Sequence, residues 1–256
     1  GGKAKGAAHT MSENTPSSGD SGGFPHQSPD KRYVRLNRHE RIQHHFVWTT
    51  FMVLAVTGFM VEFSEDVLVF FGPYRETLFY WRGVLHRAAA VLMIANIVYQ
   101  LWYIALTRTG RRYLADMIPT IKDGRDFLQN MGYYLRLTVR KPLFDRFTYK
   151  EKLEYWTGWI GNIIITLTGF FLWFPQYFPK FIFDVSILIH TMEAILASCA
   201  IMVWHFYEVH LKPGKFPMST IWLDGMIPEH ELEEEHPLEY QRIKEAERSI
   251  RYAPDI

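Results

Sequence analysis

The chain has 256 residues, a formal net charge of +1 and a mean hydropathy of −0.10. A charge this close to balance gives no reason to expect a nucleic-acid partner. The single cysteine, Cys199, excludes a disulfide framework and a cysteine cluster for zinc or an iron–sulfur centre within the chain. The average hydropathy is modest only because long apolar segments alternate with highly charged ones.

Four segments are long and apolar enough to cross a bilayer, which takes about 20 residues in a helix. They are the ranges 46–63, 84–106, 156–174 and 187–205. Tryptophans stand near the segment ends, as in the aromatic belts at the two membrane surfaces. These are Trp48, Trp81, Trp102, Trp156, Trp173 and Trp204. The pattern predicts an all-α integral membrane protein with a bundle of four transmembrane helices; the alternative is a soluble protein with buried helices.

Extramembrane segments flank and connect these spans. Residues 1–35 are predicted to form a flexible N-terminal tail, because most of this stretch is rich in Gly, Ser and Pro and has little apolar surface to bury. Residues 36–215 form the transmembrane domain, and residues 216–256 form a charged C-terminal tail. Within the long connection 107–155, residues 123–137 alternate charged with aromatic side chains, which predicts an interfacial helix.

The distribution of lysine and arginine around the spans predicts the orientation. Five basic residues lie between residue 31 and the start of the first span, and eleven lie in the connection 107–155, whereas the opposite side carries only Arg75, Arg82 and Lys180. Both termini and the long connection are therefore expected to face the cytoplasm.

Most of the eleven histidines gather at the spans. His9, His26, His230 and His236 lie in the polar tails, where a solvated side chain is expected. An ionisable residue inside a membrane segment is costly, so each remaining histidine is a functional hypothesis, with a structural hydrogen bond as the alternative. The histidines at the spans are His39, His44, His45, His86, His190, His205 and His210.

An antiparallel bundle brings these histidines to two depths. The first span starts level with the end of the fourth, so His44, or its neighbour His45, is level with His205. The second and fourth spans start on the same side, so His86 is level with His190. Because 15 residues separate His190 from His205, the two lie about 22 Å apart along the helix and project to nearly the same face. Two facing histidines can supply the axial nitrogens of a haem iron, so the pattern predicts two stacked haems.

Other site types find little support in the sequence. Arg41 and Arg87 lie beside candidate ligands and can pair with haem propionates, although snorkelling and the positive-inside bias explain them equally well. His205 and His210 lack the spacing and the number of ligands of a zinc site. No Walker loop, dinucleotide fingerprint or nucleophile elbow is present, which leaves no site for a nucleotide or for ester cleavage.

A resemblance to a known family rests on the histidine motifs: RIQHHF at 41–46, LHR at 85–87, His190, and HFY at 205–207. They are similar to motifs in the dihaem cytochrome b subunit (gamma subunit) of membrane-bound formate dehydrogenases, to which subunits of thiosulfate reductases and nickel–iron hydrogenases are related. The similarity covers residues 36–215, and the histidine set is its most specific part.

The resemblance implies four haem ligands. His44 corresponds to the first-helix ligand, with His45 as the fallback, and would pair with His205 around a cytoplasmic-side haem. His86 would pair with His190 around a periplasmic-side haem. The spacing between the two fourth-helix ligands is longer than in the family by about one residue.

The region before the third span departs from the family. The formate dehydrogenase subunits tend to carry an F-N-x-G-Q-K motif there, associated with the quinone pocket, and this chain reads FTYKEK at 147–152. Thr148 and Glu151 replace the amide residues. With His45, they are the candidates for a pocket that binds quinone as substrate, since a quinone needs hydrogen-bond donors and a route for protons. The alternative is that they are ordinary interfacial polar residues.

The leading hypothesis is an electron-transfer subunit of a larger oxidoreductase. It passes electrons through two b haems between a periplasmic partner, an iron–sulfur protein or a multihaem cytochrome c, and the quinone pool of a bacterial cytoplasmic (inner) membrane. The alternative is a membrane anchor that docks a soluble complex without a redox role of its own, which would show no haem bands. A third alternative, a proton-relaying transporter, is disfavoured because Glu193 is the only acid in the middle of the spans.

Overall fold

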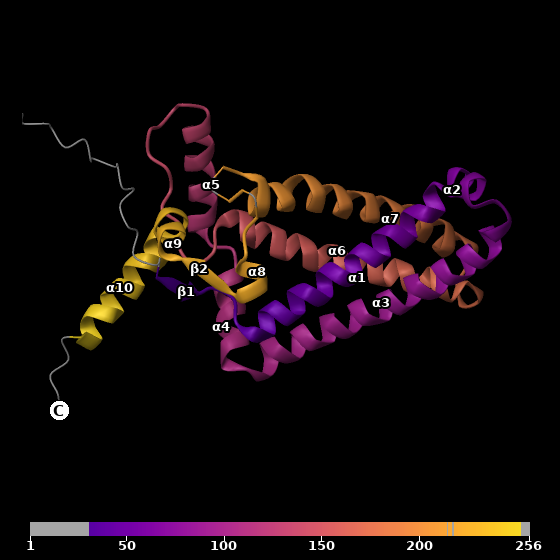
Figure 1. The fold of residues 1–256 in the computed structure, drawn as a ribbon, viewed down its shortest axis with the longest axis horizontal. Coiled ribbons are helices and arrows are strands. Elements are labelled where there is room, and N and C mark those ends of the chain that lie inside the picture. Colours follow the sequence, from indigo (N-terminus) through magenta and orange to yellow (C-terminus); the bar gives the residue numbers. More distant parts are fainter. Residues whose placement is uncertain (1–30, 214, 217, 252–256) are drawn as a thin grey trace, which may run out of the picture. The chain divides into compact units, whose positions relative to one another are not determined.

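The computed structural model describes residues 31–213, 215–216 and 218–251. Residues 1–30 of the predicted N-terminal tail, with His9 and His26, lie outside the described residues. Within the described residues, four long apolar helices run side by side and form the bundle (Figure 1). They are α1 (Arg38–Glu62), α3 (Arg75–Leu106), α6 (Tyr149–Trp173) and α7 (Lys180–Cys199). The predicted all-α fold with four membrane spans is confirmed.

Capping boxes determine where two of these helices begin. At the start of α1, the Asn37 side chain accepts a hydrogen bond from the backbone N–H of Glu40, and the Glu40 carboxylate accepts one from the N–H of Asn37. Thr148 and Glu151 form the same reciprocal pair at the start of α6, with distances of 3.2 and 2.7 Å. Two residues considered for a quinone pocket therefore define the start of the third span.

The bundle consists of two helical hairpins, α1 with α3 and α6 with α7. Small and hydroxylated residues are buried where the helices meet, including Thr50 and Thr57 on α1 and Ala89 on α3, which lets the backbones approach closely. The two hairpins share a common orientation. The hydrogen bond from Asn37 to Tyr103 places the start of α1 beside the end of α3, and the ion pair of Arg35 with Glu151 places the start of α6 at the same end, here called the N-terminal end.

Short elements complete the two ends of the bundle. At the opposite end, here called the loop end, the connections contain α2 (Ser64–Phe71), η1 (Gly72–Tyr74) and η2 (Pro175–Tyr177). The long connection at the N-terminal end contains α4 (Arg108–Met117) and α5 (Ile121–Tyr134). A helix is thus present where residues 123–137 predict one, and its interfacial position stays a prediction.

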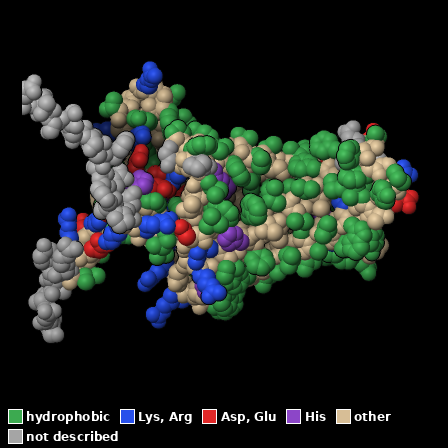
Figure 2. Space-filling view, in the orientation of Figure 1, with side chains coloured by type: hydrophobic (Ala, Val, Ile, Leu, Met, Phe, Trp, Pro, Cys, Tyr) green, Lys and Arg blue, Asp and Glu red, His purple; other side chains and the backbone are tan. Residues whose placement is uncertain are grey.

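The surface separates by polarity along the helices. Figure 2 shows hydrophobic side chains covering the length of the bundle on this face, with lysine, arginine and acidic side chains gathered at the N-terminal end. Val91 of α3, Ile163 of α6 and Leu188 of α7 are each about half exposed or more. An apolar belt of this extent matches a helical surface whose solvent is lipid. The chain is a multi-pass membrane protein.

The last helix of the bundle departs from α-helical geometry. After Cys199, α7 continues into two π-helical segments, η3 (Ala200–His205) and η4 (Tyr207–Leu211). A π turn closes with i→i+5 hydrogen bonds and so holds more residues than an α turn. Each residue of η3 therefore turns the chain less around the helix axis than a residue of an α-helix does. This offsets part of the rotation that the long spacing between His190 and His205 would otherwise add.

The C-terminal segment folds back onto the start of α1. It comprises α8 (Ile221–Asp224), β2 (Met226–Pro228), α9 (Glu229–Glu235) and α10 (Pro237–Arg251), and β2 pairs antiparallel with β1 (Arg32–Val34). Two backbone N–H groups, those of Arg35 and Leu36, donate to the Gly225 carbonyl at 2.7 and 3.1 Å. Gly225 has φ +78°, and a Cβ there would collide with the Leu36 carbonyl. Only glycine combines this left-handed conformation with such a close approach.

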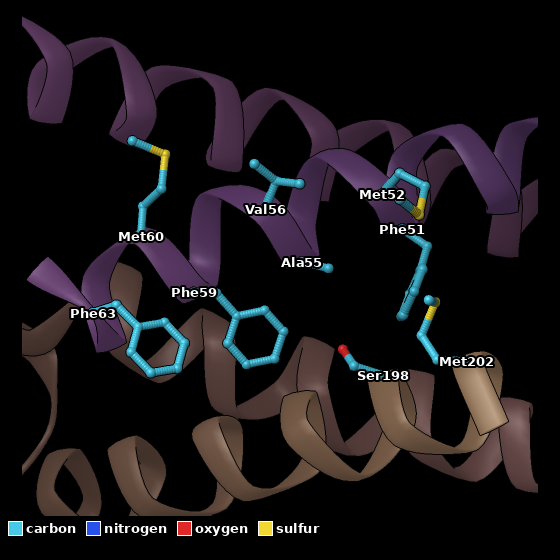
Figure 3. A pocket seen from close by; sticks show the side chains of 9 residues that line it. All are labelled: Phe51, Met52, Ala55, Val56, Phe59, Met60, Phe63, Ser198 and Met202. Carbon is cyan, nitrogen blue, oxygen red and sulfur yellow. The ribbon is translucent and has the colours of Figure 1, made fainter. Parts of the chain in front are cut away.

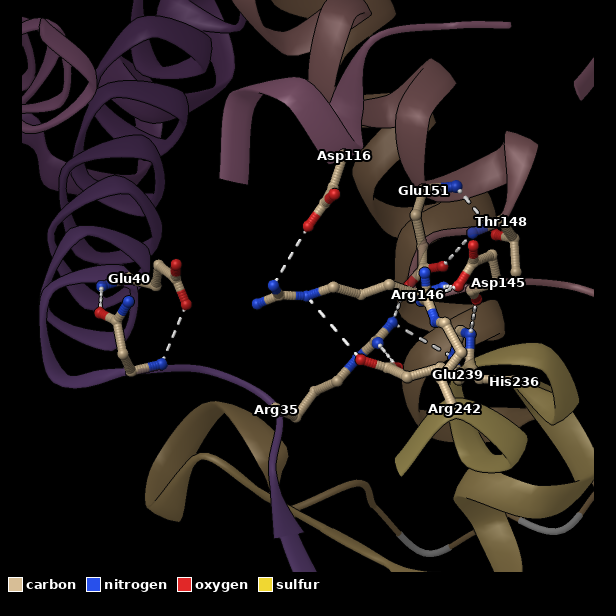
Figure 4. A network of polar contacts seen from close by, with 11 residues as sticks. Arg35, Glu40, Asp116, Asp145, Arg146, Thr148, Glu151, His236, Glu239 and Arg242 are labelled. Atoms are coloured by element: carbon tan, nitrogen blue, oxygen red, sulfur yellow. Dashed lines mark hydrogen bonds and ion pairs between the residues drawn. The ribbon is translucent and has the colours of Figure 1, made fainter. Parts of the chain in front are cut away.

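A buried ionic network holds this arrangement (Figure 4). Arg35 is only 6% exposed and donates to Glu239 at 2.9 Å and to Glu151 at 3.0 Å. Arg146 adds a bond to Asp116 at 3.1 Å. The network joins the first strand, the start of α6 and α10. The C-terminal residues are therefore packed against the bundle and are not simply a solvated helix.

His236 is part of this network, which corrects the expectation that it is solvated. Its side chain is 3% exposed. Its Nδ1 lies 2.8 Å from the Asp145 carbonyl, which can only accept, and its Nε2 lies 3.2 Å from Arg35, which can only donate. Both contacts are satisfied by the neutral imidazole with its proton on Nδ1. Burial, with the Arg35 guanidinium adding to it, lowers the pKa of His236.

This geometry predicts that acid detaches the C-terminal segment. Detached His236 titrates near pH 6.5, whereas its attached pKa is lower, so protons bind preferentially to the detached state. The stabilisation is thus present above about pH 6.5 and is lost as the pH falls below it. Limited proteolysis of the segment should accelerate between about pH 7.5 and about pH 5.5. His236→Gln should flatten this dependence on pH. The variant also separates the contribution of His236 from that of Glu239, a second titratable group in the network, whose pKa is raised by burial. Identical pH profiles for both proteins would contradict this.

Candidate functional site

Four histidines meet as two pairs at the two depths that the sequence predicts. At the N-terminal end, His44 of α1 faces His205 of η3, with ring centroids 6.4 Å apart. Toward the loop end, His86 of α3 faces His190 of α7, also with centroids 6.4 Å apart. Each pair joins one helix of the first hairpin to the last helix of the second.

The spacing within each pair fits a metal ion held between two trans imidazoles. A metal–nitrogen bond of about 2 Å and a ring radius of about 1.2 Å place the two centroids about 6 Å apart. A direct hydrogen bond between the rings would bring them closer. Among the described residues no group of three or more His, Cys, Asp or Glu could hold a metal ion. The arrangement therefore suits a metal that brings its other ligands with it, as the iron of a haem does.

Threonines orient the pair near the loop end. The Thr57 hydroxyl lies 2.8 Å from Nδ1 of His86 and donates its own proton to the Val53 carbonyl. The Thr168 hydroxyl lies 3.1 Å from Nδ1 of His190 and donates to the carbonyl four residues earlier. Each hydroxyl oxygen can thus accept from Nδ1–H, which leaves Nε2 of both rings free to bind a metal. A fixed tautomer of this kind is typical of metal-ligating histidines.

A glycine follows each of these threonines, and the one at position 169 gives the imidazole of His190 room. A Cβ at Gly169 would lie 3.2 Å from Cε1 of His190, and one at Gly58 would lie 3.7 Å from Cε1 of His86. The sequence Thr-Gly-Phe therefore occurs at the same functional position on α1 (57–59) and on α6 (168–170). Neither threonine was among the predicted site residues, although the repeated Thr-Gly-Phe is a sequence signal that both share.

The pair at the N-terminal end has different surroundings. Nδ1 of His205 lies 3.0 Å from the Glu154 carboxylate, whereas Nδ1 of His44 is buried and has no hydrogen-bond partner among the described residues. His45 lies beside Trp222 of α8, with ring centroids 5.3 Å apart, and not beside His205. The geometry thus favours His44 over His45 as the partner of His205.

Three side chains with an unpartnered buried nitrogen lie at the N-terminal end of the bundle. Nε of Arg41, Nδ1 of His210 and Nε1 of Trp222 are buried without a hydrogen-bond partner among the described residues, and the Trp222 ring centroid lies 6.3 Å from that of His44. Buried donors without acceptors are rare in a complete structure. Their grouping fits a bound molecule with acceptor oxygens, as haem propionates have. Trp222 was missed by sequence analysis because it lies in the segment taken for a tail.

Two arginines lie near the other pair. Arg87 stacks over the Trp173 ring at 5.8 Å. Arg82 donates to the Thr57 carbonyl at 3.2 Å, and its Nε is buried without a partner among the described residues. Arg82 is four residues before His86 and therefore on the same helix face. This makes Arg82 a second candidate for a propionate contact beside Arg87.

Two apolar cavities lie between the hairpins, at depths near the histidine pairs. One has a volume of ≈ 410 Å³ and lies between α1 and the last helix; Figure 3 shows its lining, which includes Phe59, Ser198 and Met202. The other has a volume of ≈ 370 Å³ and lies between α3 and α6, where Ile97 and Leu167 line it. Both are open apolar grooves, and none of the four paired histidines lines either of them.

The candidates for a quinone pocket are engaged in local structure. Glu151 accepts from the Thr148 backbone N–H through one carboxylate oxygen and from Arg35 through the other. The Thr148 hydroxyl accepts from the Glu151 N–H, which leaves its proton to donate. Glu193, the acid in the middle of a span, points at Gly161 of α6, where a side chain would collide with its carboxylate.

The chain is similar to known membrane cytochromes. The chain is 24% identical over 224 residues to the cytochrome b556(Fdn) subunit of nitrate-inducible formate dehydrogenase from Escherichia coli K12, covering 86% of this chain and 95% of that subunit. It is 22% identical over 225 residues to the cytochrome b556(fdo) subunit of formate dehydrogenase from the same strain, covering 82% and 93%. The family described as prokaryotic cytochrome b561 matches residues 35–216, which contain both histidine pairs. The chain therefore belongs to the prokaryotic cytochrome b561 family of membrane-spanning cytochromes with b-type haem.

Proposed function

We propose that this cytochrome carries two b haems, one held by His44 and His205 and one by His86 and His190. The observation that carries the proposal is the equal separation of the two pairs, 6.4 Å between ring centroids, which would let each pair hold one haem iron. Thr57 and Thr168 would fix the tautomers of His86 and His190, and the side chains of Arg41, Arg82, Arg87 and Trp222 would hold the propionates. A bound haem supplies one-electron redox chemistry.

We further propose that residues 36–215 pass electrons across the membrane between a soluble partner and the quinone pool. The two pairs lie at different depths, so haems held there provide two steps along the bundle. The relatives are named as subunits of formate dehydrogenases, which supports a place in a hetero-oligomeric complex. The soluble partner, an iron–sulfur protein or a multihaem cytochrome c, would dock at the loop end and leave residues 216–256 on the other side.

The charge distribution supports the orientation of this chain. Basic residues gather at the N-terminal end, so we place that end, with both termini, in the cytoplasm of a bacterial cell and the bundle in its cytoplasmic membrane. Quinone would then bind near His44 and His205. Thr148, whose hydroxyl proton is free to donate, and His45 are the proposed carbonyl contacts, and Glu151 is placed where it can take part in proton transfer.

Reduction by a quinol tests this function against the alternative of a redox-inactive anchor. Purified protein in vesicles is mixed with a water-insoluble quinol analogue, and the haem α-band is followed. Reduction of both haems is expected, and it should slow in Thr148→Val but not in Thr157→Val, which removes an exposed hydroxyl from the same helix. Haem that stays oxidised under excess quinol would contradict a role in quinone chemistry, and a preparation without haem would favour the anchor.

Removing the threonine hydroxyls should weaken one haem site selectively. In Thr57→Val and Thr168→Val, Nδ1–H of His86 or of His190 loses its acceptor, so the ring is no longer fixed in orientation. Such losses typically cost about 10-fold to 100-fold in metal affinity. Transfer of haem to excess apomyoglobin should therefore become faster for one haem per chain and remain unchanged for the other. Equal acceleration of both haems would show that the threonines act on the whole bundle.

A further inference from the structure

The four histidines differ in what faces Nδ1. His86 and His190 face threonine hydroxyls, and His44 faces no acceptor among the described residues. His205 alone faces a carboxylate, that of Glu154, at 3.0 Å. A carboxylate is a stronger acceptor than a hydroxyl and carries a full negative charge. The two proposed haem sites are therefore not equivalent.

Glu154 is positioned for this contact by the start of α6. It lies one turn after Lys150, the nearest basic residue on the same helix face, and Lys150 is already paired with Glu208 at 2.6 Å. Among the described residues, His205 is the only ion-pair partner of Glu154. Its side chain is 28% exposed, so water screens its charge only in part. The charge of Glu154 therefore acts mainly on His205.

We propose that Glu154 is a positioning residue that lowers the reduction potential of the haem held by His44 and His205. The inference rests on the proposed function. Accepting the Nδ1–H bond makes the imidazole of His205 a stronger electron donor through Nε2. The negative charge also stabilises the oxidised haem iron, which carries one more positive charge than the reduced iron. Both effects act in the same direction and make this haem the stronger reductant toward an acceptor at the N-terminal end.

The decisive experiment is a potentiometric titration of the purified protein with Glu154→Gln. Glutamine keeps the size of the side chain and a weaker acceptor but removes the charge. The midpoint potential of one haem should rise while that of the other stays unchanged, and the low-spin ferric electron paramagnetic resonance signal of the same haem should shift. Glu208→Gln is the matched control, since it removes a nearby carboxylate that does not contact His205 and should have a smaller effect.

Glu154→Asp is the second variant, because it keeps the carboxylate on a shorter side chain. The midpoint potential of the affected haem should lie between its values in the wild type and in Glu154→Gln. Full haem content with both potentials unchanged in Glu154→Gln would overturn the inference and leave the proposed function intact. An equal rise of this midpoint potential in Glu208→Gln would also overturn the inference. The loss of any nearby negative charge would then explain the shift without the contact between Glu154 and His205. Absence of haem from the wild-type protein would instead overturn the proposed function.

Discussion

Replacing His190 with alanine is expected to remove one of two haems and leave the other in place. His190 and His86 share one site, and His44 and His205 share another at a different depth. Each substitution would remove one of the two imidazoles that would hold that haem. Pyridine haemochrome assays should therefore fall from about two haems per chain to about one in each single variant.

Double variants test the pairing itself. His86→Ala with His190→Ala should lose no more haem than either single variant, because both residues serve the same site. His86→Ala with His205→Ala should lose both haems, because the sites are independent. His39→Ala is the matched control, since His39 lies on α1 and bonds Tyr99 without joining either pair. Complete haem loss in every single variant, with the helical content retained, would contradict two separate sites.

Replacing Arg35 with alanine is expected to release the C-terminal segment. Arg35 is 6% exposed and binds Glu151 and Glu239 directly. Its removal leaves Glu151 without its ion-pair partner and leaves Glu239 with Arg146, 4.0 Å away. Removing one partner of a buried ion pair destabilises a protein by about 3 kcal/mol or more. We take the lowest value because the Glu151 side chain is 38% exposed and water screens its charge in part. Digestion of the segment should become faster by about 100-fold if it follows the population of the detached state.

A matched control separates this effect from a general loss of charge. Lys31→Ala removes an exposed ion pair with Glu247, and exposed pairs contribute little to stability because water screens their charges. Its digestion rate should stay close to that of the wild type. If Arg35→Ala and Lys31→Ala were digested equally fast, the buried network would not be what holds the segment. Haem content should be measured in both, because Trp222 and Gly225 belong to the released part.

The sequence predicts the spans well because their signals are local. An apolar stretch of sufficient length is helical in lipid, where each backbone group must be satisfied within the helix. The pairing of His44 with His205 and of His86 with His190 follows from depth alone once four antiparallel spans are assumed. The choice between His44 and His45 needed the structure, since adjacent residues differ only in the helix face that they occupy.

Other features depend on contacts between residues distant in sequence. Strands β1 and β2 have three residues each and lie almost 200 positions apart, too short for a pattern and too distant for a turn signal. His236 looks solvated in a charged stretch, yet it is buried because Arg35 and the Asp145 carbonyl satisfy both of its nitrogens. The π-helical segment η3 likewise has no local signal beyond the long spacing from His190 to His205.

The most direct test of two b haems held by four histidines is a dithionite-reduced minus oxidised spectrum of the purified protein, with the haem quantified as the pyridine haemochrome. About two haems per chain, both of b type, are expected from the two pairs of facing imidazoles. A protein that folds in the membrane and contains no haem, or only one, would contradict the assignment.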